Sequence, residues 1–217
     1  METARAHARK SMRSMRLLWL LAILVLIFAG TAKADTLPTV KVDGTYAFAD
    51  GVYGIPPYGG SLNGVAGQAF YCVDFSTPIS AGDYWTVNIT RLTGSNFSLT
   101  RLKDQTTYLE MAWLITNMMS AKDLTQKAMY QYAIWSFTGG PTNPYGNNSS
   151  LVTLALDAVK KGFSGQGWEI LSPTPGSNGQ EFLIYVPEPA ELLMFFVGLI
   201  VLGLVARKKR VARAHAV

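Results

Sequence analysis

The stretch QAFYCVDFS, residues 68–76, contains Cys72, the single cysteine of the 217-residue chain. Apolar and aromatic residues dominate residues 69–76, which predicts a short strand. Before them, residues 51–67 (GVYGIPPYGGSLNGVAG) are rich in glycine and other turn residues and predict a loop. A lone cysteine between aromatic residues is most often a small buried hydrophobe, so the rest of the sequence must decide whether Cys72 has a further role.

The segments that follow indicate an α+β domain. Runs rich in β-branched, aromatic and aliphatic residues predict strands at residues 83–92, 168–173 and 180–187. Apolar residues at helical spacing predict helices at residues 106–119 and 124–138, with a short third helix at 151–161. The second of these ends at GGPTNPYGNNSS, a strong stop. Strands, then grouped helices, then strands again are typical of the α+β class.

The N-terminus has the pattern of a secretory signal peptide. Five basic residues within positions 1–16 precede the uncharged apolar run LLWLLAILVLIFA, residues 17–29. Ala32 and Ala34 then flank Lys33, which gives a cleavage site of the A-x-A kind for signal peptidase. The apolar run is shorter than the roughly 20 residues of a comfortable bilayer span. We therefore expect residues 1–34 to be removed; the alternative is an uncleaved N-terminal anchor.

The C-terminus combines a Pro-Glu-Pro turn, an apolar segment and a basic cluster. The members are Pro187, Glu188 and Pro189, then residues 192–206, then Arg207, Lys208, Lys209 and Arg210. The apolar segment is long enough for a thin transmembrane helix, and the basic cluster would stay cytoplasmic. A plain membrane anchor is one interpretation. The ordered pattern also resembles the PEP-CTERM sorting signal of Gram-negative bacteria, which implies removal of the tail by exosortase, a transpeptidase-like membrane protease, and a place outside the cell, often alongside exopolysaccharide.

These two signals divide the chain into residues 1–34, an exported domain at 35–186 and a sorting signal at 187–217. The whole chain carries a formal charge of +5, but residues 35–186 contain 8 basic and 11 acidic residues, a net charge of −3. The basic character therefore belongs to the targeting segments. It gives no argument for nucleic-acid binding, and we expect residues 35–186 to bind neither DNA nor RNA.

The exported domain lacks the residues of most common catalytic sites. The two histidines, His7 and His215, both lie outside residues 35–186. This excludes Ser-His-Asp and Cys-His catalysis in that domain, and any zinc site that needs imidazole. One cysteine cannot hold a thiolate-bound metal cluster. We expect no metal, no cofactor and no ordinary enzyme activity, with a hydrolase as the disfavoured alternative.

A second short motif begins 59 residues after Cys72. YCVD, with Tyr71 and Cys72, is followed by QYAIW, which holds Gln131, Ala133, Ile134 and Trp135. This pair of motifs resembles the thioester domain of bacterial surface adhesins. The resemblance implies an internal thioester between the Cys72 thiol and the Gln131 carboxamide. It also implies β-sandwich or barrel-like strands with a central helical segment. Without the resemblance, Gln131–Trp135 is one turn of an amphipathic helix and Cys72 is inert core.

We therefore expect an exported protein of the cell surface or exopolysaccharide matrix that serves in adhesion or attachment. Covalent attachment would use the thioester, with an extracellular polysaccharide or a surface nucleophile as the target. The expected processing partners are signal peptidase, the exosortase-type protease and, transiently, the inner membrane. The alternative is a non-covalent structural or carbohydrate-binding matrix protein without a thioester.

Overall fold

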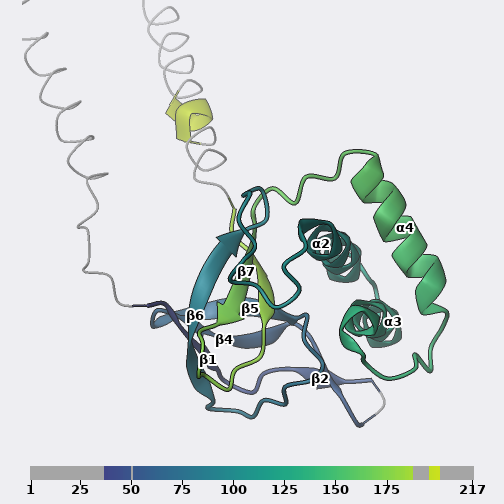
Figure 1. The fold of residues 1–217 in the computed structure, drawn as a ribbon, viewed down its shortest axis with the longest axis horizontal. Coiled ribbons are helices and arrows are strands. Elements are labelled where there is room, and N and C mark those ends of the chain that lie inside the picture. Colours follow the sequence, from purple (N-terminus) through teal and green to yellow (C-terminus); the bar gives the residue numbers. More distant parts are fainter. Residues whose placement is uncertain (1–36, 50, 188–195, 201–217) are drawn as a thin grey trace, which may run out of the picture. The chain divides into compact units, whose positions relative to one another are not determined.

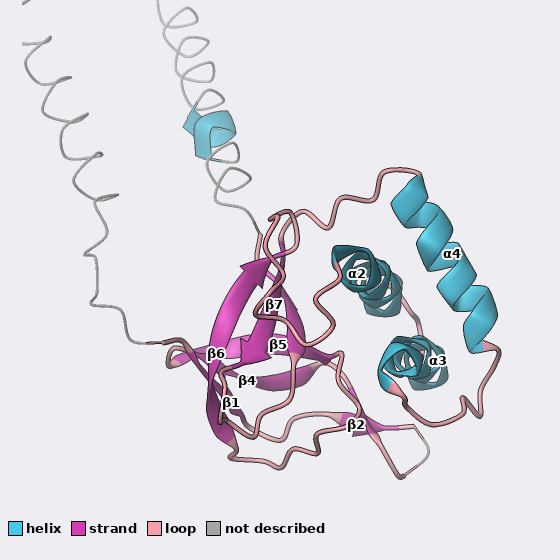
Figure 2. Cartoon of the chain, in the orientation of Figure 1, coloured by secondary structure: helices cyan, strands magenta, loops and turns pink. Residues whose placement is uncertain are grey.

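A computed structural model describes residues 37–49, 51–187 and 196–200 of the chain. Its main feature is a closed antiparallel barrel with the strand order β1-β4-β5-β8-β7-β6 (Figures 1 and 2). The barrel strands are β1 (Thr39–Val42), β4 (Tyr58–Leu62), β5 (Val65–Cys72), β6 (Tyr84–Arg91), β7 (Trp168–Pro173) and β8 (Phe182–Tyr185). Two short strands, β2 (Ala47–Phe48) and β3 (Gly54–Ile55), form a separate antiparallel pair.

Three helices lie together beside the barrel, on the side of β5 and β7 in Figure 1. They are α2 (Gln105–Met119), α3 (Leu124–Trp135) and α4 (Asn148–Lys160), and a 3-10 turn at Ser136–Thr138 continues α3. Each helix begins after a capping side chain that accepts backbone N–H groups of the first turn: Asp104, Asp123 and Asn147. The chain leaves the 3-10 turn at Gly139, whose φ of 75° is a left-handed conformation that favours glycine.

Side chains from Phe70 to Val73, at the end of β5 and just after it, alternate between two hydrophobic clusters, as expected for extended chain with both faces covered. Tyr71 and Val73 pack in the cluster between the barrel and the helices, whereas Phe70 and Cys72 belong to the cluster inside the barrel. Helix α3 contributes to both clusters, because Ala133 and Ile134 join the first and Trp135 the second. Cys72 therefore lies where the barrel interior meets α3.

The α+β class is confirmed, and the strands form a closed barrel rather than an open sandwich. The helices and the strands β6 and β7 lie where the sequence predicts them, apart from boundaries such as the start of α4 at Asn148 instead of residue 151. The strand predicted at residues 69–76 starts earlier and ends at Cys72. Strands β1 and β2 have no counterpart among the predicted elements.

The predicted loop at residues 51–67 is wrong, because this region forms β3, β4 and the first part of β5. Glycine is needed here for close packing: a Cβ atom on Gly60 would lie 2.1 Å from the backbone oxygen of Lys41. Asn63 and Gly64, with φ of 53° and 77°, form the tight turn between β4 and β5. Asn-Gly is a strong hairpin signal, so the sequence did contain evidence for these strands.

The predicted signal peptide, with Ala32 and Ala34, lies outside the described residues. Of the predicted sorting signal, Pro187 and residues 196–200, which are helical, are described. Within the described part of the chain, no helix is both long enough and apolar enough to cross a membrane.

Candidate functional site

Cys72 is the last residue of β5, and its thiol is fully buried. The indole Nε1–H of Trp135 donates a hydrogen bond to the Cys72 sulfur, with a nitrogen–sulfur distance of 3.2 Å. The thiol itself donates to the backbone oxygen of Asp74 at 3.2 Å. The sulfur is thus held between one donor and one acceptor, both in the protein interior.

Gln131 of α3 is also fully buried and lies against the same residue. Its side-chain nitrogen, Nε2, donates to the backbone oxygen of Cys72 at 2.9 Å. Its side-chain oxygen, Oε1, is buried and has no hydrogen-bond partner among the described residues. The structure therefore brings Cys72 and Gln131 together across 59 residues of sequence.

The helical repeat explains why two residues of α3 meet one cysteine. Gln131 and Trp135 are four positions apart, so they lie on the same face of the helix, one turn above the other. The other motif residues, Tyr71, Ala133 and Ile134, pack in the cluster between the barrel and the helices. These residues pack β5 against α3 and do not contact the sulfur.

Burial raises the pKa of the Cys72 thiol to about 12, and the hydrogen bond from Trp135 opposes this shift only in part. The thiol is therefore protonated at neutral pH, and only a very small fraction is thiolate. A reaction of this sulfur must therefore depend on how closely the fold places it to the reacting group, and not on the fraction of Cys72 that is ionised.

Aromatic rings cover the Cys72–Gln131 pair. The Trp135 ring packs edge-on against Phe75, Tyr53 and Tyr132, with centroid separations of 5.2, 5.8 and 5.4 Å. Such a cover keeps water away from the sulfur and the carboxamide.

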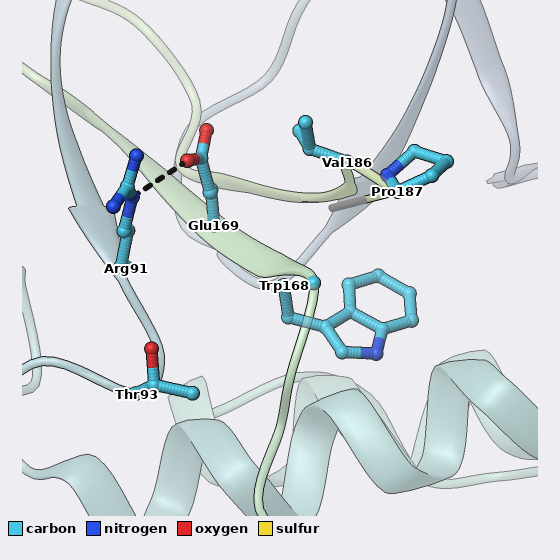
Figure 3. Close-up of a pocket in the computed structure, with 7 residues that line it drawn as sticks. Arg91, Thr93, Trp168, Glu169, Val186 and Pro187 are labelled. Atoms are coloured by element: carbon cyan, nitrogen blue, oxygen red, sulfur yellow. Dashed lines mark ion pairs between the residues drawn. The ribbon is translucent and has the colours of Figure 1, made fainter. Parts of the chain in front are cut away.

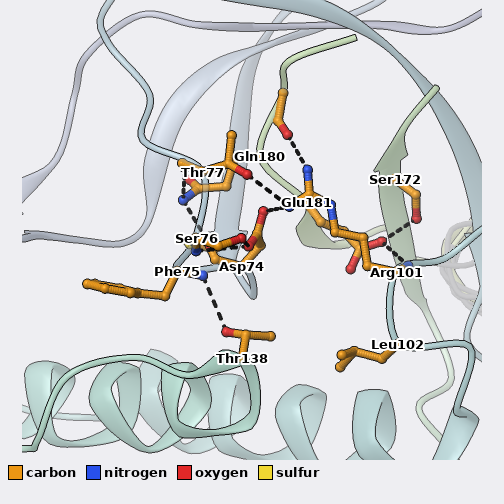
Figure 4. A network of polar contacts seen from close by, with 12 residues as sticks. Asp74, Phe75, Ser76, Thr77, Arg101, Leu102, Thr138, Ser172, Gln180 and Glu181 are labelled. Carbon is orange, nitrogen blue, oxygen red and sulfur yellow. Dashed lines mark hydrogen bonds and ion pairs between the residues drawn. The ribbon is translucent and has the colours of Figure 1, made fainter. Parts of the chain in front are cut away.

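A buried polar network holds the chain next to Cys72 in place (Figure 4). At its centre, the carboxylate of Glu181 is 1% exposed. It accepts hydrogen bonds from the Tyr108 hydroxyl at 2.5 Å, the Ser172 hydroxyl at 2.6 Å and the backbone N–H of Arg101 at 3.0 Å. Burial and the neighbouring Glu181 carboxylate raise the pKa of Tyr108.

The same network reaches the residues after β5. The Arg101 guanidinium forms an ion pair with the buried carboxylate of Asp74. The backbone oxygen of Asp74, which accepts the Cys72 thiol proton, also accepts from Gln180 Nε2 at 2.7 Å. The sequence analysis missed this network because its members are far apart in the chain. One feature of the sequence could have indicated the network: an acidic residue lies directly beside an apolar strand at two places, Asp74 after β5 and Glu181 before β8.

A second region of interest is a hollow of about 320 Å³ near the end of β8 (Figure 3). Arg91 and Glu169 form an ion pair of 3.5 Å on one side of it, and Pro187, the first residue of the predicted sorting signal, lines it as well. The remaining members of that signal, Glu188, Pro189, Arg207, Lys208, Lys209 and Arg210, lie outside the described residues. Within the described ranges, no group of three or more His, Cys, Asp or Glu side chains is placed to hold a metal ion.

Neither a family model nor a curated protein sequence matches this chain. Among solved structures, it is similar to the N-terminal domain of the Streptococcus pyogenes pilus tip adhesin Cpa. The match covers 72% of this chain and 97% of that domain, with 13% sequence identity and a TM-score of 0.40. A likeness this distant carries no argument about function.

Proposed function

We propose that this chain is an exported attachment protein of the cell surface or extracellular matrix, in which Cys72 and Gln131 condense to an internal thioester. The observation that carries the proposal is the contact between the two residues: the Gln131 carboxamide is hydrogen-bonded to the backbone of Cys72, and both side chains are fully buried. A single free thiol in an oxidising compartment is open to unwanted oxidation, and a thioester would both protect it and explain its presence.

The condensation needs no histidine and no cofactor. The Cys72 sulfur attacks the side-chain carbonyl carbon of Gln131, a carbon–sulfur bond forms, and the carbon–nitrogen bond breaks. The departing nitrogen takes the thiol proton and leaves as ammonia. Because the fold hydrogen-bonds the Gln131 carboxamide to the backbone of Cys72, the reaction would gain the large effective molarity of a well-oriented intramolecular step. The indole N–H of Trp135 stabilises negative charge as it develops on the sulfur.

The unpaired oxygen of Gln131 favours the product. A buried amide oxygen without a hydrogen bond costs about 1–3 kcal/mol. A thioester oxygen is a weaker hydrogen-bond acceptor than an amide oxygen, so leaving it unpaired costs less. The site therefore disfavours the carboxamide relative to the thioester at this atom.

Once formed, the thioester would acylate an amine or hydroxyl of an outside partner and tether the protein to it. The protein would react once per molecule, as an attachment protein and not as an enzyme with turnover. Export through signal peptidase and removal of the tail by an exosortase-type protease complete the proposal. Both rest on the sequence patterns at the two ends of the chain.

The intact mass of the protein recovered from outside the cell tests the proposal. We expect a mass about 17 units below that of the processed sequence, the mass of one ammonia. Cys72→Ala and Gln131→Ala should each abolish this deficit, as should treatment with methylamine. Gln126→Ala, which changes an exposed glutamine of the same helix, is the matched control and should keep it.

The same spectrum defines the two ends, which we expect near Asp35 and near Pro187–Pro189. A wild-type protein with no mass deficit, and with a Cys72 that alkylates freely in the native state, would contradict the thioester. A mature protein that keeps residues 192–210 would contradict the sorting proposal alone.

A further inference from the structure

A hollow of about 390 Å³ lies beside the Cys72–Gln131 site. Six aromatic side chains line it, and we call it the aromatic hollow: Tyr46, Phe48, Tyr53, Tyr58, Phe75 and Trp135. Its volume falls within the range of small-molecule sites, about 300–1,000 Å³. Phe48, at its rim, is 49% exposed, which is unusual for so large an apolar side chain.

The hollow is connected to the reactive pair through Trp135. This residue lines the hollow and also donates its indole N–H to the Cys72 sulfur. Tyr58 lines the hollow too, and it belongs to the same hydrophobic cluster as Cys72. A molecule in the hollow would therefore be separated from the sulfur by little more than one aromatic ring.

Two neutral polar side chains, Gln180 and Thr77, also line the hollow. Gln180 is 6% exposed, and its Nε2 donates to the backbone oxygens of Asp74 and Thr77. Its side-chain oxygen, Oε1, is buried and has no partner among the described residues. The Thr77 hydroxyl accepts from Arg101 at 2.9 Å, which leaves its own proton to be donated. The hollow thus offers the Thr77 hydroxyl as a donor, whereas the buried Gln180 oxygen would serve as an acceptor only after its side chain turned toward the ligand.

We propose that the aromatic hollow binds a neutral saccharide ring. Sugar rings present apolar C–H faces that pack on aromatic rings, and hydroxyls that both donate and accept hydrogen bonds. The lining matches both, with six aromatic rings and the polar side chains of Gln180 and Thr77. An alkylammonium ion fits less well, because the described residues that line the hollow include no carboxylate to balance a desolvated charge.

Binding in the hollow would select the partner that the thioester acylates, a role that rests on the proposed function. With the Trp135 ring turned aside, a hydroxyl oxygen of the bound saccharide attacks the acyl carbon of Gln131, the carbon–sulfur bond breaks, and the hydroxyl proton passes to the Cys72 sulfur. The product is an ester between the saccharide and the protein, with a free Cys72 thiol. Binding itself needs no thioester.

The test is an NMR titration of the purified Cys72→Ala protein, which cannot form a thioester. The signals to follow are the indole N–H of Trp135 and the side-chain amide of Gln180. The probes are neutral tetrasaccharides of glucose, galactose, mannose and N-acetylglucosamine. The probe n-butylamine represents the alternative ligand class, an alkylammonium ion. We expect at least one tetrasaccharide to shift both signals saturably with a Kd of about 1 mM or below, the strength of a few good contacts.

Phe48→Ala and Gln180→Ala should each weaken this binding about tenfold, a loss of roughly 1.4 kcal/mol. Phe48 is half exposed, so its variant should fold normally. Tyr84→Ala is the matched control, because Tyr84 is an exposed aromatic residue of β6 outside the hollow, 75% exposed, and binding should be unchanged. The proposal is overturned if no tetrasaccharide shifts either signal at about 10 mM, ten times the expected Kd, or if n-butylamine binds there more tightly. The mass deficit of the wild-type protein, measured separately, tells failure of the hollow apart from failure of the thioester.

Discussion

Replacing Gln131 with glutamate should make the stability of the protein strongly dependent on pH. This substitution produces the side chain that hydrolysis of the proposed thioester would leave, and it differs from glutamine by little more than one atom. The position is fully buried, and the Nε2 atom that donates to Cys72 would become an oxygen facing the backbone oxygen of Cys72. A protonated carboxyl can still donate to that oxygen, whereas a carboxylate is repelled by it.

The magnitude follows from burial. Fully buried carboxyls have pKa values raised by up to about 3–5 units, and each unit is worth about 1.4 kcal/mol. Taking the lower end, glutamate at position 131 would have a folded pKa near 7 against about 4.3 in the unfolded chain. A pKa raised on folding gives stability that is present below the unfolded value and lost as pH rises toward the folded one. The expected loss is about 4 kcal/mol at pH 7.5 and close to zero at pH 4.

Urea unfolding at both pH values measures this directly. The comparison is between Cys72→Ala and the double variant Cys72→Ala/Gln131→Glu, so that no thioester contributes to either protein. A difference in unfolding free energy below about 1 kcal/mol at pH 7.5, or one that is equal at both pH values, would show that position 131 is not the dry site described above. The expected result also means that the form with a hydrolysed thioester, which carries glutamate at position 131, is less stable at pH 7.5 than the form with glutamine there.

Two further changes test the surroundings of the site by urea unfolding. Glu181→Ala leaves two buried hydroxyls, those of Tyr108 and Ser172, without their acceptor, each worth about 1–3 kcal/mol, so a loss of at least about 2 kcal/mol is expected; a loss below about 1 kcal/mol would contradict the network. Asp104→Ala removes the cap of α2 and should cost about 1 kcal/mol. Hydrogen bonds from Thr107 lower the pKa of Asp104, so this contribution should be present at neutral pH and fade as pH falls through the acidic range. Asp157→Ala, an exposed position within α4, is the control and should change stability little.

The sequence predicts local structure well and long-range contacts poorly. The helices and the strand β6 follow from periodicity and β-branched residues that lie next to each other in the chain. The pairing of β5 with β8, which sets Cys72 opposite Phe182, depends on residues 110 positions apart and leaves no local pattern. The glycines of β4 predict a loop but belong to a strand, because glycine serves both in turns and where two backbones approach closely.

The contact between Cys72 and Gln131 could be predicted from the two short motifs that contain them. The polar network around Glu181 could not, since a carboxylate that meets a tyrosine, a serine and a backbone N–H has no characteristic spacing. The aromatic hollow was also missed. Tyr53 and Tyr58 stand out in the sequence near a proline pair, but their convergence with Phe75 and Trp135 appears only in three dimensions.

The barrel has a consequence for the order in which the protein is made. Its last strand in sequence, β8, sits between β5 and β7, so β5 has a bare edge until residues 182–185 arrive. A chain delivered from its N-terminus would expose Cys72 and Gln131 to water well before that strand is available. Unpaired strand edges are templates for pairing with other chains. A chain that ends before β8 should therefore aggregate instead of folding. The proposed bond between Cys72 and Gln131 should form only after the barrel is complete, so its presence would indicate that the whole domain has been exported.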